Sequence, residues 1–261
     1  MDERLQQLAH HIVEKISKEV RKESKKNFIK FGKTVGIGAS GSPTSYIDIV
    51  AENVALKILE KSDIKVNLLS EEKGFVDFGG NHVFILDPVD GTRNASRGIP
   101  FYAVSLAIGS SRIHDIEYGI VQNIPTGDIF TAEKHQGAFL NNIPLHVCEM
   151  PSADLLSSIS LGKNYTTRAG FLARKGNVRS LGAASLEMCL VASSALDFYF
   201  VGKNILRVID IAASTLIVRE AGGFVKTLTG ADLDMGLNLT ERTSVLTACS
   251  EHFIRDYLQK A

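Results

Sequence analysis

The chain has 261 residues, of which 44% are hydrophobic and 22% charged, a balance that is ordinary for a globular protein. A chain of this length can bury a core as one large domain or as two modest ones, which excludes a peptide or a disulfide-stapled scaffold. The 29 basic and 29 acidic residues cancel, so no broad electrostatic field favours nucleic acid or an anionic membrane as a partner.

The cysteines and the apolar runs indicate a cytoplasmic location. Cys148, Cys189 and Cys249 are widely spaced and form no CxxC pair, which favours reduced thiols over disulfides or a zinc site. No apolar run reaches the roughly 20 residues that a membrane span needs. The start MDERLQQLAHHIVEKI is too charged for a signal peptide. We therefore expect a cytoplasmic protein without a membrane partner.

The first sixty residues predict two helices with a loop between them. Residues 2–27 carry apolar side chains at helical spacing with charges in between, which is typical of a long amphipathic helix. The stretch FGKTVGIGASGSPTSYID, residues 31–48, has no period of either kind and predicts a mobile loop. From Ser45 to about Lys61 the helical pattern returns, with Asp48 near its start.

The rest of the chain changes character near residue 150. Residues 83–146 alternate short apolar segments with turn signals, which predicts an antiparallel meander. After CEMPSAD, strands alternate with helices near 165–175, from Ala184 and over 207–221, as in a layered α/β unit. We expect residues 1–150 to form an N-terminal α+β half and residues 151–261 a smaller C-terminal α/β half.

The stretch HVFILDPVDGTRN, residues 82–94, places Asp87 and Asp90 at the end of an apolar strand. In isolation it is more simply a plain turn, because Pro and Asp-Gly favour one. Glu71, which follows another strand, and Asp210, which begins a helix, add acids at similar places. Two such charges about 4 Å apart repel by about 4 kcal/mol at an effective dielectric of about 20, so a cluster needs cations or protons.

Oxygen ligands without His or Cys suit Mg²⁺ or Mn²⁺ rather than zinc. Asp87 and Asp90 could each bind a metal, and the carbonyl of Val89 could supply a further oxygen at the bend. Gly91 would let a phosphate approach the backbone, and the hydroxyl of Thr92 could orient a water. Glu72, Glu220 and Asp115 are interpreted as solvated or capping carboxylates.

Together, these acidic motifs resemble the inositol monophosphatase family of Mg²⁺-dependent, lithium-sensitive phosphatases. The motifs are EE after a strand, DPVDGTRN some sixteen residues later, and IDIAASTLIVREAGG in the C-terminal third. The resemblance covers nearly the whole chain and is closest to archaeal members with both inositol-1-phosphatase and fructose-1,6-bisphosphatase activity. It implies the sugar-phosphatase fold, an αβαβα sandwich with an antiparallel N-terminal sheet.

The resemblance also implies the site. The metal shell would be Glu71, Asp87, the carbonyl of Val89, Asp90 and Asp210, holding two or three Mg²⁺, with Mn²⁺ as a possible substitute. Glu71 and the pair of Thr92 with Asp48 would activate the attacking water. Substrate contacts would come from a larger set: Asp90, Gly91, Thr92, Arg179, Ser180, Leu181, Gly182, Ala183, Tyr165, Lys203 and Arg207.

Three residues depart from the family pattern, and one of them bears on the substrate. Ile209 and Ser214 replace a tryptophan and a glycine at packing positions, so we expect metal binding to persist. Lys203 stands where the specialised inositol enzymes carry an acid that binds sugar hydroxyls. A lysine there favours a substrate with a second phosphate, such as fructose 1,6-bisphosphate, beside myo-inositol 1-phosphate.

Other functions remain open from the sequence. Within the superfamily, the alternative is a phosphatase for 3′-phosphoadenosine 5′-phosphate or NADP. From another class, the alternative is a non-catalytic regulator that binds metal or phosphate on the same fold. We also expect a homodimer, as the family commonly forms, and no nucleic-acid partner.

Overall fold

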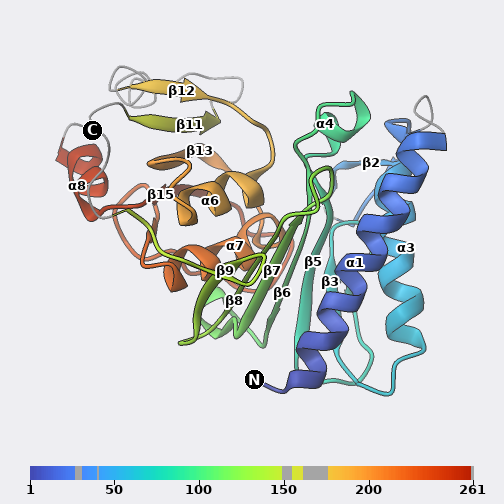
Figure 1. Ribbon diagram of the computed structural model, residues 1–261. Helices are drawn as coiled ribbons and strands as arrows, with labels where there is room; N and C mark the ends of the chain where they lie inside the picture. Colours follow the sequence, from blue (N-terminus) through green and yellow to red (C-terminus); the bar gives the residue numbers. More distant parts are fainter. Residues whose placement is uncertain (27–30, 40, 149–154, 161–175, 260–261) are drawn as a thin grey trace.

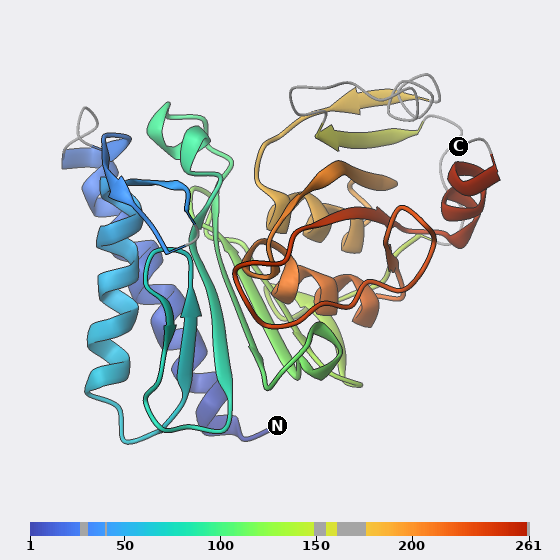
Figure 2. The ribbon, with the colours of Figure 1, turned by 180° about the vertical axis from the view of Figure 1, so that it is seen from behind.

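The computed structural model describes residues 1–26, 31–39, 41–148, 155–160 and 176–259. In these residues helices and sheets alternate in layers (Figures 1 and 2). Helices α1 and α3 cover one face of a large sheet, and α6 and α7 lie between that sheet and a second one. The expected layered α/β sandwich is therefore confirmed.

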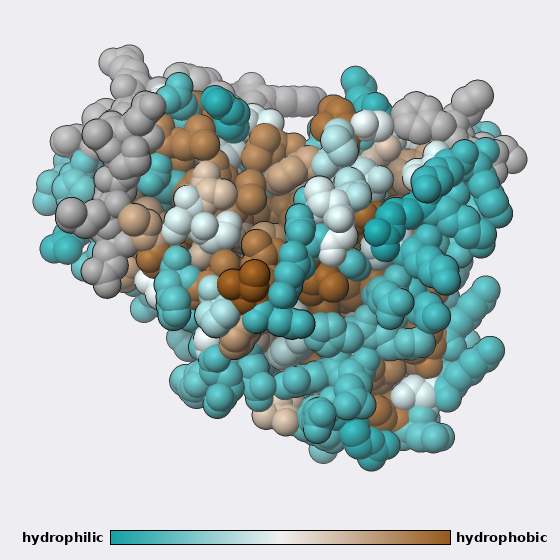
Figure 3. All heavy atoms as spheres, viewed as in Figure 1, coloured by the Kyte–Doolittle hydropathy of each residue, from teal (hydrophilic) through white to brown (hydrophobic). Residues whose placement is uncertain are grey.

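The first layer consists of α1 (Glu3–Lys26) and α3 (Tyr46–Glu60), which pack against each other and against the large sheet. The buried side of α1 carries Leu5, Ala9, Ile12, Val13, Ile16 and Val20, at the helical spacing seen in the sequence. Its outer face is hydrophilic (Figure 3). None of the helices in the described part of the chain has the length and apolarity that crossing a bilayer requires.

The large sheet has eight strands in the order β10-β9-β8-β7-β6-β5-β3-β4. Neighbours from β5 to β10 are antiparallel, which confirms the expected meander, whereas β3 joins β5 in parallel. The strands are β3 (Asn67–Ser70), β4 (Gly74–Val76), β5 (Val83–Asp90), β6 (Ala103–Gly109), β7 (Tyr118–Asn123), β8 (Ile129–Glu133), β9 (Gly137–Leu140) and β10 (Ile143–Leu145).

The stretch expected to be a mobile loop contains a small hairpin. Strands β1 (Thr34–Ile37) and β2 (Pro43–Ser45) pair in antiparallel orientation, with an irregularity between Thr34 and Gly36. The prediction of a segment without regular structure was wrong here, because the residues of β1 are all exposed and show no hydrophobic alternation, so the strand depends on backbone pairing with β2. The short helix α4 (Thr92–Ser96) and the 3-10 turn η1 (Ile113–Asp115) complete this half.

The second sheet has five strands in the order β12-β11-β13-β15-β14. These are β11 (Leu156–Ser160), β12 (Asn177–Arg179), β13 (Phe198–Leu206), β14 (Phe224–Lys226) and β15 (Thr243–Ala248). The helices of this half are α6 (Ala184–Ala192), α7 (Val208–Glu220) and α8 (Glu251–Gln259), of which α8 packs on β15. The helix expected near 165–175 lies outside the described residues.

One hydrophobic core connects the two halves. Helix α7 contacts strands β5 to β9 of the large sheet, and α6 contacts both α7 and β13. The same cluster of buried side chains includes Ile85 and Val121 from the large sheet and Phe200 and Leu246 from the smaller one. The expected boundary near residue 150 falls in 149–154, which are outside the described residues. Cys189 and Cys249 are buried, and Cys148 is exposed.

Candidate active site

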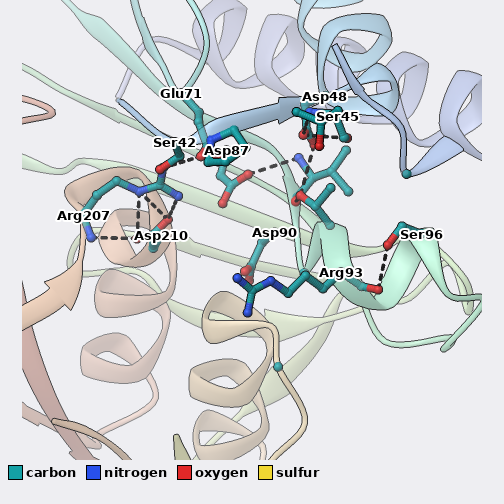
Figure 4. Close-up of a pocket in the computed structure, with 17 residues that line it drawn as sticks. Ser42, Ser45, Asp48, Glu71, Asp87, Asp90, Arg93, Ser96, Arg207 and Asp210 are labelled. Atoms are coloured by element: carbon teal, nitrogen blue, oxygen red, sulfur yellow. Dashed lines mark hydrogen bonds and ion pairs between the residues drawn. The ribbon is translucent and has the colours of Figure 1, made fainter. Parts of the chain in front are cut away.

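A cavity of about 560 Å³ lies where the ends of β3 and β5 meet the starts of α4, α6 and α7. Its volume falls in the range of roughly 300–1,000 Å³ that small-molecule sites occupy. Figure 4 shows the side chains that line it. The predicted residues that line this one cavity are Asp48, Glu71, Asp87, Val89, Asp90, Gly91, Thr92, Gly182, Arg207 and Asp210.

A β-bulge explains how Asp87 and Asp90 face the same cavity. Asp87 pairs with Ser105 and Asp90 with Ala103, so three steps along β5 match two along β6. In a regular strand, positions three apart point to opposite faces, and one extra residue brings them to the same side. Pro88, which has no N–H for the ladder, lies within the bulge.

The two acids at the end of β5 are deeply buried and electrostatically strained. Asp87 is 2% exposed and Asp90 is 8% exposed. Burial, followed by the charges of Glu71, Asp90 and Asp210, raises the pKa of Asp87 well above its ordinary value. Burial also raises the pKa of Asp90. Ionised together, these groups require nearby positive charge or hydrogen-bond donors.

The start of α6 supplies donors to Asp90. The backbone amide of Ala184 donates to Oδ1 at 3.2 Å, and that of Ser185 donates to Oδ2 at 2.7 Å. The Ser185 hydroxyl donates to the same Oδ2 at 2.5 Å. These bonds join residues that are 94 and 95 positions apart, so Asp90 links β5 to the second half of the chain.

Arg207 supplies positive charge between Glu71 and Asp210. Its Nη2 donates to Oδ1 of Asp210 at 2.7 Å, and its Nη1 donates to Glu71. Burial lowers the pKa of the guanidinium, but Asp210 and Glu71 outweigh it and hold that pKa above its ordinary value. Figure 4 shows the side chain directed at Asp210. Arg207 was predicted as a substrate contact, and this ion-pairing role was missed.

Asp48 and Thr92 form the expected pair. The Thr92 hydroxyl lies 3.1 Å from Oδ1 of Asp48 and 2.9 Å from the carbonyl oxygen of Val89, and it can donate to either. Oδ2 of Asp48 accepts the amide and the hydroxyl of Ser45, the N-cap residue of α3. Burial is the main cause that raises the pKa of Asp48 to about 6. Because the Thr92 hydroxyl donates to Asp48 or Val89, its oxygen keeps a lone pair that can accept a hydrogen bond from another donor in the cavity.

The donor set fits a hard divalent cation, because it consists of carboxylates and a carbonyl. Within the described ranges, however, no three His, Cys, Asp or Glu side chains converge closely enough to hold one ion. The contacts above give the reason: Glu71 and Asp210 are turned to Arg207, and Asp90 is turned to α6. Ligation therefore requires these carboxylates to turn toward a common point.

The predicted sugar-contacting segment lies only partly at the cavity. Gly182 lines it, and Ala183 packs against Gly91. The carbonyl of Leu181 accepts a hydrogen bond from Asn94 at 2.7 Å. Arg179 and Ser180 are exposed and do not line the cavity, and the guanidinium of Arg179 donates to the neighbouring carbonyl of Val178.

Two further predicted contacts involve side chains outside the described part of the chain. Tyr165 lies outside the described residues. Lys203 belongs to β13, but its side chain is likewise outside what the structure describes. Their roles stay predictions.

Sequence reasoning missed Glu187, a carboxylate only 1% exposed. It accepts the amides of Leu181 and Gly182 at 3.0 and 3.1 Å and the hydroxyl of Ser158. It thereby holds the loop that carries Gly182 to the cavity. A signal was present, because Glu187 is the lone charged residue of ASLEMCLVA, the sequence of α6.

Arg93 was also missed. It lines the same cavity, and in Figure 4 its side chain extends from α4. The described residues hold no ion-pair partner for it within 4.0 Å, which distinguishes it from Arg207. Its position directly after Thr92 in DGTRN was the available signal.

The three carboxylates interpreted as solvated or capping have different outcomes. Glu220 accepts the amides of His135 and Gly137, and Asp115 accepts that of Arg112, as capping groups do. Glu72 differs, because it is partly buried and accepts the hydroxyl of Thr44. Burial is the main cause that raises its pKa to about 7. Glu72 therefore belongs to the electrostatics of the site.

Two curated relatives are similar over most of this chain. The fructose-1,6-bisphosphatase/inositol-1-monophosphatase of Methanothermobacter thermautotrophicus is 36% identical, over 83% of this chain and 82% of its own length. The bifunctional NADP phosphatase/NAD kinase of Methanococcus maripaludis is 35% identical over 93% of this chain. The matched part is 47% of that relative, so this chain spans about half the length of the bifunctional protein.

Solved structures and a family model agree with these relatives. An inositol monophosphatase–fructose 1,6-bisphosphatase superposes with a TM-score of 0.86 at 30% identity, covering 98% of this chain and 99% of that one. A Pyrococcus horikoshii protein with similarities to inositol-1 monophosphatase gives 0.79 at 30% identity, covering 95% and 97%. The model of the inositol monophosphatase family, whose members are generally metal-dependent, matches residues 1–258. The chain therefore belongs to the inositol monophosphatase family, as its acidic motifs predicted.

Proposed function

We propose that this protein is a Mg²⁺-dependent phosphomonoester hydrolase for phosphorylated sugars and polyols. Its foremost substrates would be the C1 phosphate of fructose 1,6-bisphosphate and myo-inositol 1-phosphate. The observation that carries the proposal is the gathering of Glu71, Asp87, Asp90 and Asp210 in one cavity with Gly91 and Thr92. The relatives named as fructose-1,6-bisphosphatase/inositol-1-monophosphatase support the substrate class.

Two or three Mg²⁺, or Mn²⁺ in their place, would be held by Glu71, Asp87, the Val89 carbonyl, Asp90 and Asp210. Metal bound by these residues would supply Lewis-acid chemistry, polarising a phosphate and making a water more acidic. The protein's own contribution is positional. Thr92 can accept a hydrogen bond from the attacking water, because its own proton is directed at Asp48 or Val89. The amides of Gly91 and Thr92 would bind the phosphate, and the 179–183 segment, of which Gly182 lines the cavity, would contact the rest of the substrate.

A phosphate-release panel tests this proposal. Fructose 1,6-bisphosphate, myo-inositol 1-phosphate, 3′-phosphoadenosine 5′-phosphate and NADP are each supplied with Mg²⁺ and then with chelator. We expect turnover of the first two, which chelator abolishes. Asp90→Asn should abolish release while the circular dichroism spectrum stays that of the wild type. Turnover that persists in chelator or in Asp90→Asn contradicts the assignment.

NADP phosphatase activity is the second candidate. It is favoured by the 35% identity to the bifunctional NADP phosphatase/NAD kinase of Methanococcus maripaludis. In the panel, faster release from NADP than from fructose 1,6-bisphosphate would select it. A non-catalytic regulator would bind phosphate without turnover.

The proposal also includes a homodimer, a cytoplasmic location and no nucleic-acid partner. The balance of 29 basic and 29 acidic residues supports the last of these. Light scattering on the purified chain measures the oligomeric state, and a monomeric mass would contradict the dimer.

A further inference from the structure

Arg207 occupies the carboxylate oxygens that the proposed metal needs. Its Nη1 donates to Oε1 of Glu71, and its Nε and Nη2 donate to the carboxylate of Asp210 at 3.2 and 2.7 Å. The three side chains are 14%, 15% and 10% exposed, so water screens these contacts little. A guanidinium in this position neutralises part of the acidic cluster by itself.

The two acids are not held equally. Asp210 also accepts the backbone amide of Arg207, through Oδ2 at 2.6 Å, as part of the capping box of α7. This bond is made by the backbone of Arg207, so a turn of the guanidinium would leave it in place. Glu71 follows β3 directly, and its contact with Arg207 crosses 136 positions of the sequence. Glu71 is therefore the acid that loses its partner when the Arg207 side chain turns away.

A divalent cation and the guanidinium are both positive and need the same oxygens. Placed together at Glu71 and Asp210 they would repel each other, and each coordination bond would displace a hydrogen bond. The lack of convergence among the described His, Cys, Asp and Glu side chains follows from the same contacts.

We propose that Arg207 is a built-in counter-ion that competes with the metal for Glu71 and Asp210, and that metal loading releases its guanidinium from Glu71. The inference rests on the proposed metal-dependent function. It gives Arg207 a positioning role: the side chain keeps the acidic cluster folded without metal and weakens metal binding in return. The freed guanidinium then lies in the same cavity as the substrate phosphate.

Three variants test the competition. Arg207→Met keeps an unbranched side chain and removes its charge and its hydrogen-bond donors. Arg207→Lys keeps a point charge but loses the fork that contacts two carboxylates. Arg93→Met is the matched control, because Arg93 lines the same cavity and the described residues offer it no carboxylate partner within 4.0 Å.

The readouts are the Mg²⁺ dissociation constant from titration calorimetry and the thermal midpoint in chelator. We expect Arg207→Met to bind Mg²⁺ about tenfold more tightly and to unfold at a lower temperature in chelator, because repulsion within the cluster is then uncompensated. Arg207→Lys should lie between Arg207→Met and the wild type. Arg93→Met should change both quantities much less.

The outcomes separate this inference from the proposed function. Folded Arg207→Met or Arg207→Lys with unchanged or weaker Mg²⁺ affinity overturns the competition. If Arg93→Met tightens Mg²⁺ binding as much as Arg207→Met does, the competition is also overturned. Removal of any positive charge from the cavity would then have the same effect. If the wild-type protein binds no Mg²⁺, the proposed cofactor itself fails.

Discussion

Ser185 donates both its backbone amide and its hydroxyl to Oδ2 of Asp90, at 2.7 and 2.5 Å. Ser185 lies in the first turn of α6 and Asp90 ends β5, so the acidic end of the first sheet is fixed against the second half of the chain. Hydrogen bonds to an ionised carboxylate lower its pKa, and here they oppose the burial that raises it. Ser185 thus favours the ionised form of Asp90.

Ser185→Ala removes the hydroxyl donor and leaves the amide. The pKa of Asp90 should rise further, so the acidic limb of the kcat/KM profile should move to higher pH. Activity near neutral pH then falls and recovers as the pH is raised. Loss of one hydrogen bond should lower the free energy of unfolding by about 1 kcal/mol. Phosphate release across the pH range and thermal unfolding measure the two effects.

Ser193→Ala is the control for Ser185→Ala. Its hydroxyl donates to the carbonyl of Leu190 at the other end of α6, at 3.2 Å. We expect this variant to keep the wild-type pH profile. If Ser185→Ala also keeps it, the proposed support of Asp90 is refuted.

Gly91 combines a left-handed backbone with close packing beside the cavity. Its φ is +86°, and an added Cβ would lie 3.1 Å from the Cβ of Ala183 and 3.2 Å from the carbonyl oxygen of Phe101. Gly91→Ala should lower the free energy of unfolding by more than the roughly 1–2 kcal/mol of the left-handed conformation. It should also reduce kcat, because Asp90 and Thr92 flank this position.

Gly79→Ala separates conformation from packing. Gly79 has a φ of +78°, and an added Cβ would meet nothing within 4 Å. Chemical denaturation of both variants gives the difference between their losses in the free energy of unfolding. Equal destabilisation by Gly91→Ala and Gly79→Ala would show that the contacts around Gly91 carry no cost.

The sequence predicted the acidic cluster better than its surroundings. An apolar run that stops at Asp87 predicts strand β5. The family motifs add Glu71 and Asp210, which line the same cavity as Asp87. The bulge that turns Asp87 and Asp90 to one side depends on pairing with β6, a long-range contact that no local pattern reports. The parallel pairing of β3 with β5 was not predicted from the sequence for the same reason.

The partners of the acids were harder to predict than the acids themselves. Glu187 and Ser185 lie in a helix whose sequence is otherwise a core pattern, and their hydrogen bonds connect segments far apart in the chain. Arg207 precedes Asp210 by three residues, so its ion pair with Asp210 follows from helical spacing. Its contact with Glu71 depends on how the two halves meet.

Glu187→Ala should loosen the loop that carries Gly182. The change leaves the amides of Leu181 and Gly182 without their buried acceptor, at a cost of about 1–3 kcal/mol for each unsatisfied group. We expect KM for sugar phosphates to rise more than kcat falls, because Gly182 of this loop lines the cavity while the proposed metal ligands lie on other elements. Steady-state kinetics with fructose 1,6-bisphosphate measure the changes in KM and kcat separately.

Glu187→Gln is the conservative companion. The amide oxygen of Gln can still accept from one or both backbone N–H groups. It should recover a large part of both KM and stability relative to Glu187→Ala. A fall in kcat with KM unchanged in both variants would rule out the positioning role.

Without divalent cations, the thermal midpoint should fall as the pH rises from about 5 to about 8. The pKa of Asp48 is about 6 and that of Glu72 about 7 in the folded protein, against ordinary values of 3.8 and 4.5. At a pH between the ordinary and the raised pKa of such a group, the folded state keeps the proton that the unfolded state has lost. The free energy of unfolding therefore decreases as the pH rises through this range. Asp234 and Glu133, whose pKa values are lowered from 3.8 and 4.5, do not contribute in this window. Burial lowers the pKa of His10 from 6.5, which adds a slope of opposite sign that the acids must outweigh.

Glu72→Gln isolates one contribution to this slope. The neutral amide cannot lose a proton, so the midpoint measured in chelator should fall less steeply across the upper part of the window. Mg²⁺ should flatten the wild-type curve as well, because a bound cation stabilises the ionised carboxylates around it. Scanning calorimetry at several pH values, with chelator and then with Mg²⁺, gives the curves. A wild-type midpoint in chelator that rises with pH through this window would contradict the raised pKa values of Asp48 and Glu72, since the proton release would then favour the folded state.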